Sequence, residues 1–179
     1  MKLASLGLWM IMTLGASTVA ADTSSWEGKT FPDYQLANQT GAVIDNSKFN
    51  GRWVLYYFYP KDNTPGCSIE ADNFAKRHEQ FVADGLEIVG ISLDDVESHA
   101  KFAKDFNVKF DLLADVDKAL SEKLDMVNIL PWPHTRRESF LVNAEGIIVK
   151  HYPTVNPREH VEQVAKDFAA LSQPKDKMK

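Results

Sequence analysis

The chain has 179 residues, 44% of them hydrophobic, which is enough for one domain with a sizeable core. Its formal net charge at pH 7 is −5, and this acidic balance argues against nucleic acid or a membrane surface as a binding partner. Cys67 is the single cysteine of the sequence, which excludes an internal disulfide framework.

The first 21 residues have the layout of a secretory signal peptide. Lys2 precedes an apolar run from Leu3 to about Leu14, and small residues follow as far as Ala21. The apolar run is too short to span a membrane. We therefore expect residues 1–21 to be removed on export, to a bacterial periplasm, with a retained N-terminal anchor as the alternative. The mature domain would cover residues 22–172, and residues 173–179 would form a charged tail.

The first predicted elements surround an uninterrupted apolar run. Residues 31–45 alternate weakly around the turn Asn38–Gly41 and predict a β-hairpin. The seven apolar or aromatic residues Trp53–Tyr59 predict a strand that is buried on both faces, as in a parallel sheet. A helix is expected to begin near Cys67, and a second buried strand covers residues 86–92. Strand, helix and strand at this spacing predict a right-handed parallel βαβ unit.

The second half of the chain adds further helices and strands. Asp94 and Asp95 cap a predicted helix that runs through Phe106, and Pro157 opens a last amphipathic helix. The inner face of this last helix is predicted to hold Val161, Val164, Phe168 and Leu171. The other elements are a short strand at 109–113, a short helix at 118–124 and a hairpin of strands 139–142 and 147–152. This order predicts an α/β thioredoxin-like sandwich, with a central mixed sheet and flanking helices.

Cys67 lies where the first buried strand gives way to a helix. Pro60 ends the strand because it offers no N–H to a neighbouring strand, and Asp62 to Gly66 form a polar turn. In open α/β sheets, ligands bind at the carboxyl ends of the strands, and a helix N-terminus favours negative charge. The position therefore favours a reactive thiolate, whereas a small buried hydrophobic residue is the commoner role of a free cysteine.

The residues around Cys67 resemble a known family signature. Pro60-x-x-x-Thr64-x-x-Cys67 is similar to the peroxidatic motif of the peroxiredoxins (the AhpC/TSA family), and the longer string Phe58–Cys67 resembles the bacterioferritin-comigratory, or peroxiredoxin Q, branch. The likeness covers roughly Phe31 to Leu171. It implies a thiol-dependent peroxidase that reduces hydrogen peroxide and small organic hydroperoxides and needs no cofactor.

The resemblance assigns roles to four residues. The thiolate of Cys67 would attack the peroxide and become a sulfenic acid. Thr64 would turn its hydroxyl into the same pocket, although a turn or helix-capping role is the alternative. In the family, an arginine three residues before the aromatic residue of this strand points at the thiolate. Arg137 holds that place before Phe140, so the resemblance gives it this role, while Arg136 would point toward solvent. Pro60 would stiffen the loop and keep water from the thiol. The alternative for the arginines is that both are solvated charges.

Three further residues are weaker candidates for the substrate pocket. Gly66 directly precedes Cys67, and Glu70 lies one helical turn after it, where it would brace Arg137 or lie on a solvated helix face. Trp132 would shape an apolar rim. His134 is not expected to be a base. The five histidines show no metal-ligand spacing, and the sequence carries no Gly-rich phosphate loop, so we expect neither a metal nor a cofactor.

The reduction of the oxidised residue is predicted to depend on a partner. Many similar relatives carry a resolving cysteine five residues after the peroxidatic one, but this chain has Asp72 there. An external thiol, either a small molecule or a thioredoxin-like protein, would therefore reset Cys67 in a one-cysteine mechanism, and we expect a monomer or weak homodimer. A dithiol exchanger or copper carrier would need a second nearby cysteine. An exported redox sensor or chaperone without turnover remains the alternative.

Overall fold

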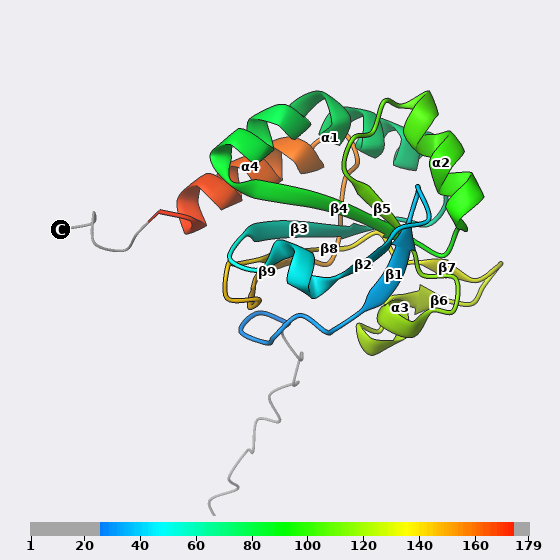
Figure 1. The fold of residues 1–179 in the computed structure, drawn as a ribbon, viewed down its shortest axis with the longest axis horizontal. Coiled ribbons are helices and arrows are strands. Elements are labelled where there is room, and N and C mark those ends of the chain that lie inside the picture. Colours follow the sequence, from blue (N-terminus) through cyan, green and yellow to red (C-terminus); the bar gives the residue numbers. More distant parts are fainter. Residues whose placement is uncertain (1–25, 174–179) are drawn as a thin grey trace, which may run out of the picture.

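The computed structural model of the protein describes residues 26–173, which form a seven-stranded sheet with helices on both faces (Figure 1). The strand order is β2-β1-β5-β4-β3-β8-β9. The strands are β1 (Gln35–Asn38), β2 (Val43–Asp45), β3 (Trp53–Phe58), β4 (Leu86–Ser92), β5 (Asp111–Ala114), β8 (Ser139–Val142) and β9 (Ile148–Tyr152). The central strands β3, β4 and β5 are parallel, while β1 and β8 pair with them antiparallel. The predicted mixed sheet of a thioredoxin-like sandwich is confirmed.

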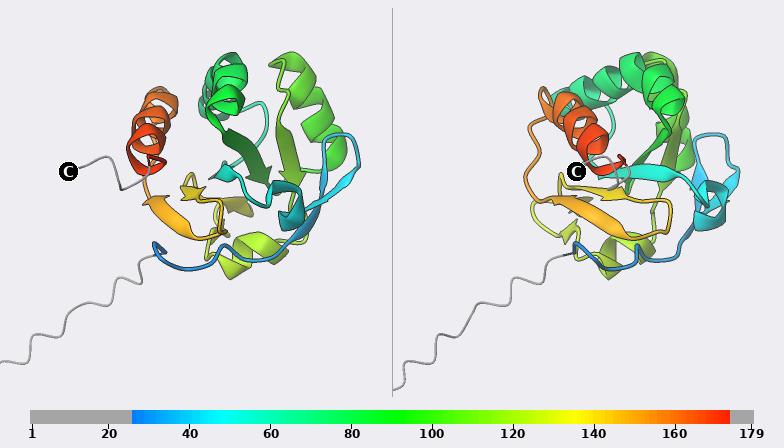
Figure 2. Two further views of the ribbon diagram at one scale, coloured as in Figure 1. Left: turned by 60° about the vertical axis from the view of Figure 1, so that its left-hand side comes forward. Right: turned by 90° about the vertical axis from the view of Figure 1, so that its left-hand side faces the viewer.

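The helices form two layers around this sheet. The helices α1, α2 and α4 cover one face, and the short α3 lies on the other (Figure 2). The helices are α1 (Pro65–Asp84), α2 (Val96–Asp105), α3 (Ala119–Lys123) and α4 (His160–Leu171), with the 3₁₀ helix η1 (Asn46–Phe49) after β2. A separate two-stranded sheet of β6 (Val127–Asn128) and β7 (His134–Thr135) precedes β8. The sequence did not predict this small sheet, because two-residue strands carry no periodicity.

Strand β3 separates the two hydrophobic cores of the domain. Successive side chains of a strand point to opposite faces, so a strand that is buried on both sides needs an unbroken apolar run. The side chains that enter the core beneath α1 and α4 are Leu55, Tyr57 and Tyr59. Those that enter the opposite core are Val54, Tyr56 and Phe58. Cys67 belongs to the first core, so the thiol and α3 lie on opposite faces of the sheet.

Helix α1 begins and ends where the local residues require it. Thr64 is the N-cap and Pro65 is the first helical residue, where the missing N–H of proline has no helical partner to lose. Gly85 follows the last turn with φ +92°, and its N–H bonds to the carbonyls of Phe81 and Val82. Glycine adopts this left-handed conformation without steric penalty. These two ends fix Cys67 in the first turn of the helix.

The structure corrects two details of the last helix. Helix α4 begins at His160 and not at Pro157, because the carbonyl of Asn156 accepts hydrogen bonds from the N–H groups of Glu159 and His160, which closes a separate turn ahead of the helix. Val161, Val164 and Phe168 are buried as predicted, but Leu171 is 44% exposed at the end of the helix.

The two predicted terminal segments are only partly described. The predicted signal peptide, residues 1–21, lies outside the described residues, and so does the predicted tail apart from Gln173. Within residues 26–173, no helix combines the length and apolar character needed to cross a bilayer.

Candidate active site

Two polar side chains from different parts of the chain contact the thiol of Cys67. The Sγ atom lies 2.8 Å from Oγ1 of Thr64 and 3.1 Å from Nη2 of Arg137, and the cysteine is only 1% exposed. Arg137 reaches the site because β8 pairs antiparallel with β3, and the N–H of Phe58 continues this pairing to the carbonyl of Glu138. The fold therefore brings together the predicted thiol, hydroxyl and guanidinium groups. Their catalytic roles remain predictions.

The hydroxyl of Thr64 faces the thiol and does not cap the helix. Thr64 occupies the N-cap position of α1, but its side chain makes no capping hydrogen bond. Its Oγ1 lies 3.0 Å from the carbonyl oxygen of Lys61 as well as 2.8 Å from Sγ. A hydroxyl both donates and accepts, so it can accept from a thiol while donating to Lys61, or donate to a thiolate.

Gly66 gives the guanidinium room to approach. A Cβ atom at this position would lie 3.2 Å from Nη2 of Arg137 and 3.6 Å from the ring of Pro157. The first distance is tighter than ordinary van der Waals contact, so a larger residue would push Arg137 away from the sulfur. Gly66, a weaker candidate in the sequence, thus lies beside the guanidinium that also contacts Cys67.

Arg137 is held from its other side by Glu70. The carboxylate is fully buried, and its Oε2 accepts a hydrogen bond from Nη1 of Arg137. The alternative that Glu70 lies on a solvated helix face is therefore wrong. Burial lowers the pKa of Arg137, but the negative charges of Glu70 and Cys67 together outweigh burial and raise it. The guanidinium thus stays protonated and bridges a carboxylate and a sulfur.

The neighbouring Arg136 points away from this cluster. Its Nε donates to Oε1 of Glu138 at 2.6 Å, and its Nη2 lies 3.7 Å from the carboxylate of Asp125. Glu138 also contacts Nε2 of His151 at 2.8 Å. Burial raises the pKa of Glu138, but its hydrogen bonds with His151 and Arg136 outweigh burial and lower it. Two adjacent arginines thus serve different carboxylates, and one of them reaches Cys67.

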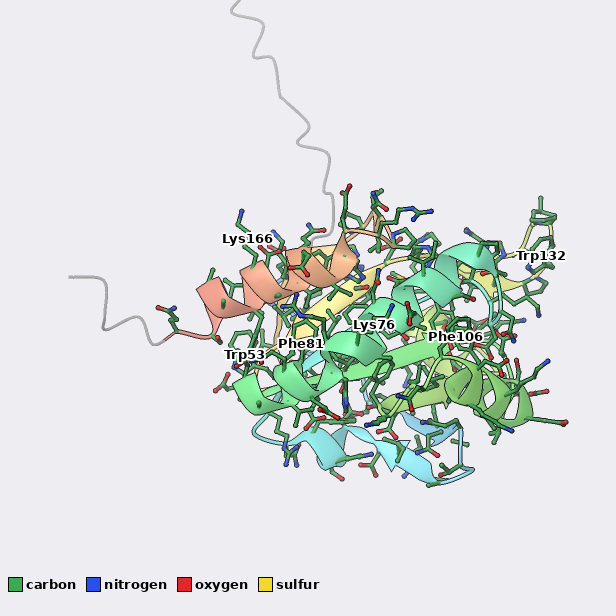
Figure 3. All side chains as sticks on the ribbon, turned by 90° about the horizontal axis from the view of Figure 1, so that it is seen from above. Trp53, Lys76, Phe81, Phe106, Trp132 and Lys166 are labelled. Carbon is green, nitrogen blue, oxygen red and sulfur yellow. The ribbon has the colours of Figure 1, made fainter. Side chains whose placement is uncertain are left out.

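Pro60, in the loop that precedes Cys67, lies near Trp132. With their neighbours they line a small cavity of about 50 Å³, whose other lining residues are Lys61, Leu93, Asp94 and Pro133. Trp132 is 55% exposed and projects at the end of the molecule far from Trp53 (Figure 3). Nδ1 of His134 lies 2.6 Å from the carbonyl oxygen of Trp132. The structure thus puts Trp132 beside Pro60, and its contribution to a substrate pocket remains a prediction.

A buried network behind this loop was not anticipated from the sequence. Asp62 is only 5% exposed and accepts hydrogen bonds from the hydroxyls of Tyr59 and Ser98, at 2.9 and 2.7 Å. Nδ1 of the fully buried His99 lies 2.9 Å from the same carboxylate. The sequence indicates only a turn at Asp62. Its partners on α2 lie more than 30 residues away, so no local pattern signals the contact.

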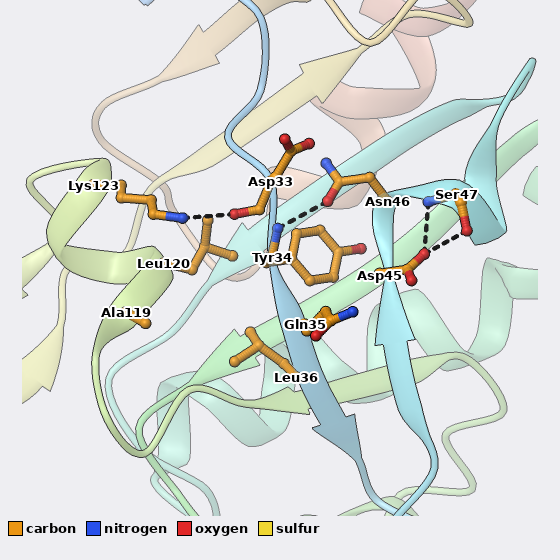
Figure 4. A pocket seen from close by; sticks show the side chains of 10 residues that line it. All are labelled: Asp33, Tyr34, Gln35, Leu36, Asp45, Asn46, Ser47, Ala119, Leu120 and Lys123. Atoms are coloured by element: carbon orange, nitrogen blue, oxygen red, sulfur yellow. Dashed lines mark hydrogen bonds between the residues drawn. The ribbon is translucent and has the colours of Figure 1, made fainter.

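A larger cavity lies on the other face of the sheet. It has a volume of about 530 Å³ and opens between η1, β1 and α3 (Figure 4). Its lining includes Tyr34 and Leu120, which belong to the core opposite Cys67. The sheet therefore separates this cavity from the thiol. Within residues 26–173, no group of three or more His, Cys, Asp or Glu side chains is arranged to hold a metal ion.

Comparison with known proteins identifies the family. Residues 28–151 match the model of the AhpC/TSA family. The chain is 32% identical over 151 residues to peroxiredoxin Bcp of Bacillus subtilis, with 82% of this chain and 96% of that protein covered. It is 37% identical over 150 residues to the chloroplastic peroxiredoxin Q of Sedum lineare, with coverage of 81% and 78%.

Solved structures of the same group share the fold. Peroxiredoxin Q of Xanthomonas campestris superposes with a TM-score of 0.73 at 30% identity, covering 78% of this chain and 92% of that one. Peroxidoxin BcpB of Mycobacterium tuberculosis superposes with a TM-score of 0.75 at 26% identity, with coverage of 81% and 97%. The chain therefore belongs to the AhpC/TSA family and is a thiol-dependent peroxidase of the Bcp and peroxiredoxin Q group.

Proposed function

We propose that Cys67 is the peroxidatic residue and that Thr64 and Arg137 are its catalytic partners. The observation that carries the proposal is the convergence of a hydroxyl and a guanidinium on the sole thiol of the chain, at 2.8 and 3.1 Å. In the reaction, the thiolate attacks one peroxide oxygen, an S–O bond forms and the O–O bond breaks. The sulfur is oxidised by two electrons to a sulfenic acid, and the leaving oxygen takes a proton to become water or an alcohol.

The two partner groups act on the oxygens of the peroxide. Arg137 carries a fixed positive charge and Thr64 a donor, so both stabilise the negative charge that grows on the leaving oxygen. Glu70 holds the guanidinium from behind. The preferred substrates are hydrogen peroxide and small organic hydroperoxides, because a thiol that is only 1% exposed admits small reactants most readily.

An external thiol completes the cycle. The position five residues after Cys67 is Asp72, whose carboxylate pairs with Lys76 at 2.5 Å on the same helix. The sulfenic acid therefore condenses with a thiol from outside, releasing water and leaving a mixed disulfide, which a second thiol reduces. A small thiol or a thioredoxin-like protein fits this role, and the protein acts as a monomer or weak homodimer.

Repeated turnover is the test of this function. We expect wild-type protein to consume many equivalents of hydrogen peroxide when a reducing thiol is supplied, and the Cys67→Ser variant to consume none. A single round of oxidation without further consumption would indicate a redox sensor instead. Equal consumption by the wild type and the Cys67→Ser variant would overturn the assignment of Cys67.

We also propose that the protein is exported, to a bacterial periplasm. Residues 1–21 support this, since Lys2, the apolar run and the small residues before Asp22 follow the order of a secretory signal. Export would expose the thiol to an oxidising compartment with its own reductants. N-terminal sequencing of protein recovered from the compartment should find Ala21 or Asp22. A mature chain that still begins at Met1 would contradict the proposal.

A further inference from the structure

A buried histidine of the last helix touches the group that holds Arg137. His160 is the first residue of α4 and is fully buried. Its Nδ1 lies 2.8 Å from Oε1 of Glu70, whose Oε2 accepts the hydrogen bond from Arg137. Nη2 of Arg137 then lies 3.1 Å from Sγ of Cys67. A continuous series of contacts therefore links a residue 93 positions later in the chain to the thiol.

We propose that His160 is a positioning residue for the peroxidase reaction, which keeps one oxygen of Glu70 occupied so that Arg137 has a donor left for the sulfur. This inference rests on the proposed function. His160 touches neither the thiol nor the peroxide, so it acts only through Glu70 and Arg137.

Competition between two binding modes of Arg137 gives the physical reason. A guanidinium and a carboxylate prefer a bidentate pair, in which two N–H groups bond to two oxygens. In that mode both Nη1 and Nη2 would turn toward Glu70, and Nη2 would be drawn away from Cys67. His160 makes this mode less favourable, because its Nδ1–H already donates to Oε1 of Glu70 and competes with Nη2 for that oxygen. The buried carboxylate thus has a donor on each oxygen, as a buried charge requires.

The surroundings hold the ring of His160 in this orientation. Phe74 and Tyr152 contact it edge to face, with ring centroids 5.3 and 5.5 Å away. Its Nε2 is buried and has no hydrogen-bond partner within the described residues. The hydrogen-bond network therefore assigns the ring proton to Nδ1, which faces a carboxylate, and leaves the lone pair at Nε2.

The backbone before α4 keeps this histidine against α1. Nδ2 of Asn73 lies 3.4 Å from the carbonyl oxygen of Pro157, and the ring of Pro157 lies against Gly66. The turn ahead of α4 therefore contacts α1 on the same side as Glu70. This fixes the register of His160 relative to the carboxylate.

The test compares variants that remove or keep the donor. His160→Leu and His160→Phe both remove the donor. Their side chains differ in shape, so the test can be carried out if either variant folds. His160→Asn keeps an amide donor close to the position of Nδ1. A hydrogen bond to a charged group corresponds to about tenfold or more in rate, so we expect His160→Leu and His160→Phe to lower the rate constant with hydrogen peroxide about tenfold. His160→Asn should stay within about threefold of the wild type.

Three further measurements separate positioning from packing. Thermal unfolding is recorded for every variant, and His78→Leu, at a histidine of α1 outside this series of contacts, is the control that should leave the rate unchanged. In the Glu70→Gln background, His160→Leu should lower the rate constant with hydrogen peroxide by less than about a further twofold, because His160 acts through Glu70. The rate of Cys67 alkylation by iodoacetamide should follow the same ranking without any turnover.

Each outcome decides the proposal. A wild-type rate in His160→Leu, equal losses in the Leu and Asn variants, or a full additional loss in the Glu70→Gln background would overturn it. If the wild type shows no peroxide turnover, the proposed function fails, and the alkylation ranking still decides whether His160 positions Arg137.

Discussion

The contact between Arg137 and Cys67 gives the most direct prediction. Replacing Arg137 by alanine removes the guanidinium that lies 3.1 Å from Sγ and that also holds the buried Glu70. We expect the second-order rate constant for hydrogen peroxide at pH 7 to fall, because the thiolate and the leaving oxygen both lose a charged donor. Stopped-flow measurement of intrinsic fluorescence, or competition with a second peroxidase, would measure this rate constant.

The structure bounds the size of the loss. A hydrogen bond to a charged group contributes roughly 1.5–3 kcal/mol, which corresponds to about 10- to 150-fold in rate. The Coulomb energy of two unit charges 3.1 Å apart is about 5 kcal/mol at an effective dielectric constant of about 20, which is an upper bound. The hydrogen-bond range is the better estimate of the loss than the Coulomb bound, because the side chain of Arg137 is 19% exposed and Thr64 still donates to the sulfur. We therefore expect a loss of about 10- to 150-fold.

Two control variants make the prediction specific. Arg136→Ala should keep the rate within about twofold, since Arg136 contacts Glu138 and Asp125. Arg137→Lys keeps a charge but not the planar fork, so it should lose less than Arg137→Ala and more than Arg136→Ala. A larger loss in Arg136→Ala than in Arg137→Ala would refute the reasoning, and so would a wild-type rate in Arg137→Ala.

Three further expectations can be checked independently. Thr64→Val should lower the peroxide rate constant about tenfold or more and Thr64→Ser much less, because only the hydroxyl lies 2.8 Å from Sγ; equal losses in both variants would contradict this. After one equivalent of peroxide, intact mass should show a monomer with one added oxygen that dimedone traps, and a quantitative disulfide-linked dimer as the species reduced in turnover would rule out the proposed resolution. Burial raises the pKa of Tyr56 from 10.0 to about 12, although its hydrogen bond with Tyr34 lowers it. The native state therefore keeps a proton that the unfolded chain releases, so the free energy of unfolding should fall between pH 10 and 12, by about 1.4 kcal/mol per pH unit for this group; denaturant titrations with a constant midpoint over this range would contradict it.

The sequence predicts those parts of the fold that depend on local pattern. The run Trp53–Tyr59 predicts a doubly buried strand because it is uninterrupted and apolar. In the structure, both faces of this strand pack against a hydrophobic core. Pro65 and Gly85 mark the ends of α1 through their own backbone preferences. The small sheet of β6 and β7 escapes such reasoning, since its strands have two residues each.

Some contacts of the candidate site could likewise be predicted from the sequence, and others could not. The proximity of Thr64 to Cys67 follows from their three-residue spacing across the start of α1. The side on which Arg137 lies is available only from the resemblance to the peroxiredoxins, in which an arginine three residues before the aromatic residue of this strand points at the thiolate. The burial of Glu70 could not be predicted, because the same spacing on α1 suits a solvated face. His160 carries no local signal, since its partner lies 90 residues earlier in the chain. Contacts of this kind depend on how α4 packs against α1, which no local pattern encodes.

The position of Asp72 on α1 offers a way to time the opening of this helix. Five helical residues span about 7.5 Å along the axis, which exceeds the roughly 7 Å limit on the Cα separation of a disulfide. A cysteine introduced by Asp72→Cys would therefore bond to Cys67 only when the first turns of α1 come apart. The rate at which this disulfide appears after peroxide treatment would therefore measure how fast the helix opens. If the helix opens slowly, a second peroxide molecule would reach the sulfenic acid before the disulfide forms. The engineered protein would then lose activity to overoxidation.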